Sequence, residues 1–206
     1  MAQTSAAQQR IHKAALQLFA ERGHTQVTIS ELAEAAGIAR GTVYNNLKNP
    51  DSLFESVAAL LADDMIQRVQ LLFVAIEDPA LRLATGIRLW LRRAHAEPQW
   101  GRFLVRFAFG SVALQEFWTG PPVVDLMHGI ERGRYQAKAE QLPTLVAMVT
   151  GTALGAIFLV LEGRRTWRDA GSEAAELILV ALGLSREEAH ALANAELPSL
   201  PDAPPG

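Results

Sequence analysis

Residues 40–48, with the sequence RGTVYNNLK, combine polar and apolar side chains at positions that suit one short helix. Arg40, Thr42 and Asn45 would share an outward face of this helix. The apolar Val43 would point the other way, toward a core. A guanidinium, a hydroxyl and an amide can hydrogen-bond base edges and phosphate oxygens. The chemistry indicated by this face is therefore recognition of a nucleic-acid duplex rather than catalysis.

A helix start, a tight turn and an abrupt stop surround this segment. Thr28 and Glu31 have the spacing of a capping box, in which each side chain hydrogen-bonds a free backbone N–H, so a helix begins there. Gly37 suits the left-handed conformation that ends many helices. A second helix over about residues 39–47 then stops before Asn49-Pro50, because proline pushes the preceding residue out of the helical region. The pattern predicts a helix-turn-helix.

This arrangement resembles the DNA-binding segment of the TetR family of transcriptional regulators. The stretch GIARGTVYNNLKNPDSLF is similar to the family's recognition helix. LQLFAERG and TISELAEAAG are similar to its first and second helices at the expected spacing. The resemblance covers about the first quarter of the chain, and beyond Phe54 only length and helical character agree. It implies a homodimer that binds a palindromic double-stranded DNA operator, acts as a repressor and is released by a small-molecule effector.

Motif matching and donor chemistry divide the candidate DNA-binding residues into two groups. Base edges are assigned to Arg40, Thr42 and Asn45, with Gly41 permitting close approach, and phosphates to Thr28, Tyr44, Asn46 and Lys48. We expect the Tyr44 ring to be half packed in the core with its hydroxyl outward. The family usually has a lysine just after the recognition helix, where this chain has Pro50. That departure keeps an alternative open, a helical dimeric adaptor without sequence-specific DNA binding.

The composition is that of a globular protein, with 206 residues of which 50% are hydrophobic and none is cysteine. The lack of cysteine excludes disulfides and thiolate metal sites. The N-terminal sequence MAQTSAAQQR lacks the apolar core of a secretion signal, so we expect a cytoplasmic location. Residues 1–50 carry five bases and three acids, or +2, whereas the remainder carries 14 bases and 19 acids, or −5. Only the N-terminal region therefore suits a polyanion.

Apolar periodicity near 3.6 residues, together with abundant Ala, Leu, Glu, Arg and Gln, predicts an all-α fold. We expect a three-helix DNA-binding domain, the head, over residues 1–50. Residues 51–196 would form a larger helical domain for effector binding and dimerisation, the body, and the proline-rich residues 197–206 a disordered tail. The helices are expected over residues 6–22, 28–36, 39–47, 51–76, 80–95, 99–109, 121–139, 143–164, 172–183 and 185–195.

Residues 141–161 contain no charge and are long enough to cross a bilayer. Three threonines, a glutamine and a proline dilute their apolarity, and the stretch is isolated, so a buried helix is preferred over a membrane span. Its small residues would let another helix approach closely. That helix could belong to the same chain, but the resemblance places a four-helix dimer interface here. The expected interface residues are Met148, Gly151, Thr152, Gly155, Phe158 and Leu177.

Aromatic residues concentrate between residues 90 and 118, where they could line a ligand pocket or simply form core. The expected pocket residues are Trp90, His95, Trp100, Phe103, Phe107, Trp118, Met127 and His128. An apolar or aromatic effector is preferred. An organic anion held by Arg102 or Arg106 is the second choice.

The sequence favours no enzymatic class. It contains no glycine-rich phosphate loop, no histidine pair at i and i+4 and no nucleophile elbow. We therefore expect no catalytic residues, no cofactor and no metal site.

Overall fold

The computed structural model describes residues 5–47 and 49–199, and this part of the chain is helical with no strand. The all-α prediction is confirmed. Lys48 and residues 200–206, which include most of the predicted tail, lie outside the described residues. The helices are α1 Ala6–Arg22, α2 Ile29–Ala36, α3 Arg40–Asn46, α4 Leu53–Phe73, α5 Pro79–Ala96, α6 Pro98–Phe107, α7 Val112–Thr119, α8 Pro121–Glu131, α9 Leu142–Leu161, α10 Trp167–Ala181 and α11 Arg186–Ala193, with 3-10 turns at Pro50–Ser52 and Ala139–Gln141.

The head consists of α1, α2 and α3, and its helix ends follow the local sequence. The Thr28 hydroxyl accepts a hydrogen bond from the Glu31 backbone N–H at 3.3 Å, and the Glu31 carboxylate accepts one from the Thr28 N–H at 2.7 Å. Gly37 ends α2 with a φ of 62°, a conformation that side chains with a Cβ rarely adopt. The predicted capping box and turn are therefore present.

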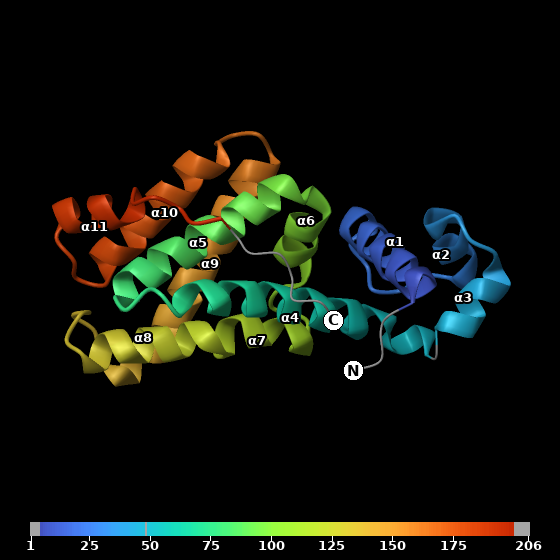
Figure 1. Ribbon diagram of the computed structural model, residues 1–206, viewed down its shortest axis with the longest axis horizontal. Helices are drawn as coiled ribbons and strands as arrows, with labels where there is room; N and C mark the ends of the chain where they lie inside the picture. The colour runs from blue at the N-terminus through green and yellow to red at the C-terminus, as the bar shows by residue number, and fades with distance from the viewer. Residues whose placement is uncertain (1–4, 48, 200–206) are drawn as a thin grey trace.

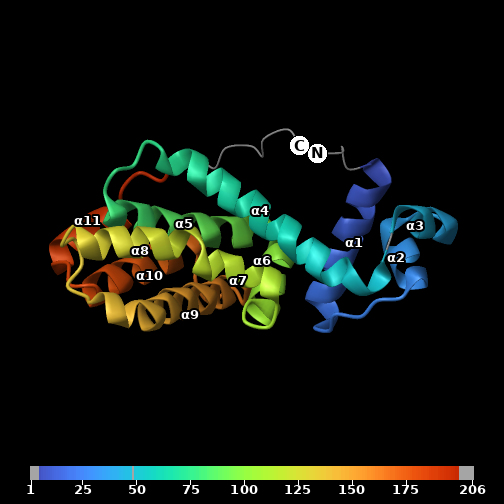
Figure 2. The same ribbon diagram turned by 90° about the horizontal axis from the view of Figure 1, so that it is seen from below.

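A single long helix, α4, connects the head to the body. Figure 1 shows the head at one end of the molecule and α4 reaching it from the body, and Figure 2 shows the same helix from below. Phe54 at the start of α4 packs 5.3 Å from the Phe19 ring of α1 and 5.4 Å from the Phe103 ring of α6. This aromatic contact joins the head, the connecting helix and the body in one core.

In the body, α5 lies at the centre and contacts α6, α8, α9, α10 and α11. Its start is well defined, because the Asp78 carboxylate accepts a hydrogen bond from the Ala80 N–H at 3.0 Å and Pro79 occupies the first helical position. Along the other side of the body, α7 packs against α4 and α8. A cavity lies between α4, α5, α7, α8 and α9.

Several helix boundaries differ from the prediction. The helix expected from residue 51 begins at Leu53, because Pro50–Ser52 form a 3-10 turn, and ends at Phe73 rather than Ile76. The helix expected over residues 121–139 stops at Glu131, since Gly133 takes a φ of 65°. Helix α7 was not predicted, and α10 begins at Trp167 rather than residue 172. Its start is set by Thr166, whose hydroxyl accepts from the Asp169 N–H.

Candidate functional site

Helix α3 presents a polar surface on the outside of the head. Val43 is fully buried and anchors the helix, while Arg40, Gly41 and Asn45 are exposed and Thr42 is partly exposed. The prediction for Tyr44 is wrong, because 66% of this residue is exposed and its ring is not packed in the core. The exposed ring adds an amphipathic side chain to the same surface as the polar residues.

Gly41 faces open space. A Cβ added at this position would have no heavy atom within 4 Å apart from its own local backbone. Its backbone conformation does not require glycine either, since the positive φ angles of the described residues lie elsewhere. The described part of the chain therefore gives no structural reason for a glycine at position 41.

Two of the residues assigned to phosphates are already hydrogen-bonded within the head. The Asn46 side-chain amide donates to the Thr42 carbonyl at 2.8 Å, and its oxygen accepts from the Ser5 hydroxyl at 3.0 Å. The Thr28 hydroxyl serves the capping box. Asn46 joins α3 to the start of α1 and so helps to fix the orientation of α3 in the head.

The other two arginines of the head, Arg10 and Arg22, form hydrogen bonds within the head. Arg10 donates to the carbonyl oxygens of Ala36 and Gly37 at 2.7 and 2.9 Å, which satisfies the C-terminal end of α2. Backbone hydrogen bonding from Thr28, followed by the Arg22 side chain, lowers the pKa of the Glu31 carboxyl to about 2. The Arg40 side chain, in contrast, has no hydrogen-bond or ionic partner in the described part of the chain. It is the head arginine that remains available on the α3 surface.

A partly open apolar cavity lies in the body between α4, α5, α7, α8 and α9. Its volume is about 100 Å³, comparable to the roughly 150 Å³ cavities that bind benzene-sized molecules. Trp90 and Trp118 lie against it with their ring centroids 5.4 Å apart. The lining is mostly apolar, with a few polar groups, and comprises Met65, Ile66, Val69, Gln70, Phe73, Arg82, Leu83, Gly86, Ile87, Trp90, Trp118, Pro122, Asp125, Val149, Thr150 and Ala153.

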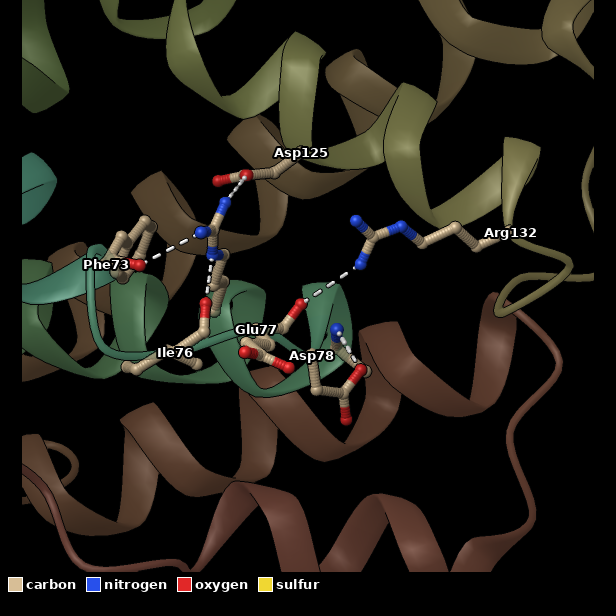
Figure 3. A network of polar contacts seen from close by, with 8 residues as sticks. Phe73, Ile76, Glu77, Asp78, Asp125 and Arg132 are labelled. Atoms are coloured by element: carbon tan, nitrogen blue, oxygen red, sulfur yellow. Dashed lines mark hydrogen bonds and ion pairs between the residues drawn. The ribbon is translucent and has the colours of Figure 1, made fainter.

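Arg82 forms the polar corner of the cavity, where its guanidinium closes the C-terminal end of α4. It donates to the carbonyl oxygen of Phe73 at 2.9 Å and to that of Ile76 at 2.5 Å. The third contact, at 2.9 Å, is an ion pair with Asp125 of α8 (Figure 3). These groups connect the end of α4 with α5 and α8 at the cavity wall.

Six of the eight residues predicted to line the pocket lie away from the apolar cavity. Trp100, Phe103 and Phe107 pack in the core that joins α6 to α1, α4 and α5, because that face of α6 points toward neighbouring helices. His95 is exposed, Met127 does not line the cavity, and His128 lines a separate polar hollow. Arg102 is exposed and Arg106 donates to the Glu21 carbonyl of α1, so neither lines the cavity. Sequence reasoning missed the α4 residues of the lining, because their apolar spacing is the same as that of a core helix.

A second surface lies on α9. One side of this helix is buried against the body through residues such as Val149 and Ile157. The other side leaves Gly151 and Gly155 with nothing within 4 Å of an added Cβ, and exposes Phe158. Leu177 of α10 is also exposed, and Met148 and Thr152 are partly exposed. The described part of this chain therefore supplies no helix that packs closely on these glycines.

The segment Ala139–Leu161 is long and apolar enough to span a membrane by length and composition. The same test is passed by core helices of globular proteins. Here α9 packs against α5, α6 and α10. Its buried residues belong to the same core as those of α5 and α10.

Known proteins share both parts of this architecture. Residues 11–57 match the sequence profile of the bacterial regulatory proteins of the tetR family, and residues 78–195 match the tetracyclin repressor-like C-terminal domain. RolR in complex with resorcinol is 26% identical, with a TM-score of 0.71 over 95% of this chain and 96% of that one. FadR from Bacillus subtilis in complex with stearoyl-CoA is 19% identical, with a TM-score of 0.70 over 83% and 97%, and shares the fold. With a helix-turn-helix head, a helical body and profile matches over both, this chain belongs to the TetR family of transcriptional regulators.

Proposed function

We propose that this regulator is a repressor that binds a palindromic operator as a homodimer and is released by a small, mostly apolar or aromatic ligand. The observation that carries the proposal is the exposed polar face of α3, with Arg40 unpaired and Gly41 unobstructed, on a helix anchored by the buried Val43. Arg40, Thr42 and Asn45 would read base edges, and Tyr44 and Lys48 would contact phosphates. A cytoplasmic location accompanies this function.

Dimerisation would use the uncovered side of α9 and α10. One recognition helix reads only a few base pairs, and two related half-sites require two heads held at a fixed separation. Gly151 and Gly155 would let a partner helix come close, and Phe158 and Leu177 would supply apolar area. An isologous pairing of this face with itself is the simplest arrangement that gives a two-fold symmetric reader.

The ligand would bind in the apolar cavity of the body. Its lining suits an aromatic or aliphatic molecule, and the volume of about 100 Å³ suits about one ring before any helix moves. The 26% identity to RolR, whose structure contains resorcinol, supports a small aromatic compound. Trp90 and Trp118 would contact it directly.

Ligand binding would act on DNA affinity through α4. The part of α4 that lines the cavity, Met65 to Phe73, has a contact with an arginine of α5 at each end. Arg93 of α5 approaches the Asp64 carboxylate to 2.6 Å at one end, and Arg82 binds the Phe73 carbonyl at the other. A ligand bound beside this part of α4 would favour one position of the helix over another. Such a shift requires that the ligand bind the two positions with unequal affinity. A coupling of about 1 to 3 kcal/mol would change operator affinity about 5- to 150-fold.

The test is to select duplexes from a random DNA pool with the full-length protein at fixed salt and to sequence those retained. An enriched palindrome supports the dimeric regulator and supplies a probe for an effector screen. Absence of enrichment, together with no salt-dependent binding, would favour the dimeric adaptor without sequence-specific DNA binding. If an operator is found and saturating cavity ligands leave its affinity unchanged, the ligand-release part of the proposal fails.

A further inference from the structure

Two hollows of the body share a wall. The apolar cavity and a second, polar hollow both have Arg82 and Asp125 in their linings. The polar hollow has a volume of about 410 Å³ and is also lined by Glu77, Pro79, His128 and Arg132. The Arg82–Asp125 ion pair therefore lies between the apolar cavity and the polar hollow, and a molecule that occupied both would have to pass this pair.

The two arginines of the polar hollow differ in how well their charges are compensated. Arg82 is paired with Asp125 and donates to two carbonyl oxygens. The Arg132 side chain makes one hydrogen bond within the described chain, to the Glu77 carbonyl oxygen at 3.5 Å, which is at the long limit for such a bond. Figure 3 shows this side chain reaching from the end of α8 toward Glu77. Its guanidinium retains N–H groups that can bind another acceptor.

The other ionisable residues that line the polar hollow form no ion pair with the Arg132 guanidinium. His128 is exposed, and its imidazole has no hydrogen-bond or ionic partner in the described part of the chain. Glu77 offers its main-chain carbonyl to Arg132, and no ion pair joins the Glu77 carboxylate to that guanidinium. Asp125 is held by Arg82. Among the described residues, Arg132 is therefore the arginine of the hollow that has no acidic partner.

We propose that the ligand of the apolar cavity carries a carboxylate, which enters the polar hollow and binds the Arg132 guanidinium. The inference rests on the proposed ligand-binding function and specifies the chemical class of its ligand as an aryl or alkyl carboxylic acid. Arginine binds carboxylates through two parallel N–H···O hydrogen bonds, which gives both affinity and orientation. A neutral ligand of the same shape fills the cavity but leaves the Arg132 guanidinium with its single long hydrogen bond.

The test compares matched acids and alcohols on the full-length protein. A series of ω-phenylalkanoates of increasing chain length is titrated beside the corresponding ω-phenylalkanols, by calorimetry and by tryptophan fluorescence, because Trp90 and Trp118 line the cavity. We expect the best acid to bind about 10-fold or more tightly than its alcohol. Arg132→Gln is expected to remove most of this preference and to leave alcohol affinity unchanged. The control Arg102→Gln changes an exposed arginine that lines neither hollow, and is expected to preserve the preference.

The outcomes separate this inference from the proposed function. Equal affinity for acids and alcohols in the wild type, or a preference that survives in a folded Arg132→Gln protein, overturns the carboxylate assignment and keeps the cavity as a ligand site. If no member of either series produces heat or a fluorescence change, the cavity does not take aryl-alkyl ligands, and both proposals are rejected. Thermal melts of the variants verify that they fold.

Discussion

Replacing Gly41 with Ala tests whether the α3 surface approaches DNA. An added Cβ meets nothing within 4 Å in the free protein, so the variant should fold without steric cost. Exchange of glycine for alanine in a helix stabilises it by about 0.5 to 1 kcal/mol, and the lower figure applies because Gly41 is the second residue of α3. For a chain of this length that is a rise in melting temperature of about 1 to 2 °C. The variant should therefore be at least as stable as the wild type.

DNA affinity should move in the opposite direction. If the backbone at Gly41 lies against the duplex, a methyl group there pushes α3 outward and loses at least one contact of about 1 to 3 kcal/mol, which is about 5- to 150-fold in affinity. Gly41→Leu, with a larger side chain of good helix propensity, should weaken binding further while remaining stable. Fluorescence anisotropy with the selected operator and a scrambled duplex, beside thermal melts of the same preparations, measures both effects. Unchanged operator affinity in both variants would show that recognition does not use this surface.

Three further predictions concern the head and the α9 face. Arg40→Ala should relax sequence preference at one operator position, whereas Lys48→Ala should weaken binding to all duplexes alike and reduce the slope of log affinity against log salt by about one. Fluorescence anisotropy with operator variants measures both effects. Equal effects of the two substitutions would contradict the assignment of Arg40 to bases and Lys48 to phosphates. Gly151→Leu should leave the protomer folded, because its Cβ meets nothing within 4 Å, yet weaken dimerisation about 10-fold or more in sedimentation; an unchanged dimer would place the interface elsewhere. Glu31→Gln should lower the stability of the head at pH 6, because the folded pKa of Glu31 is about 2 against an ordinary 4.5. The stability that this carboxylate contributes is present above pH 4.5 and is lost as pH falls toward 2, so the wild-type and variant melts should converge over that interval, and a gap independent of pH would refute the assignment.

The site was less predictable than the fold. Arg40, Gly41 and Asn45 lie exposed on one helix as the spacing indicates, because neighbours on a short helix are fixed by local geometry. Tyr44 is more exposed than expected. The contact of Asn46 with Ser5 at the start of α1 could not be predicted from the sequence, because the two residues are 41 positions apart. For the pocket, Trp90 and Trp118 line the cavity, but Phe103 and Phe107 pack at the junction with the head. The local sequence around an aromatic residue does not show whether its ring will line a cavity or pack in a core.

The sequence by itself determined the helical class, the capping box at Thr28, the turn at Gly37 and the order of polar and apolar faces on α3. These features depend on backbone conformation and on contacts a few residues apart, which adjacent residue types specify. Only the tertiary structure decided that Arg82 closes the end of α4 at a cavity, that this cavity adjoins the hollow of Arg132, and that the described residues leave one side of α9 uncovered. Each of these joins helices far apart in the chain, and the position of one helix against another depends on the packing of all side chains between them.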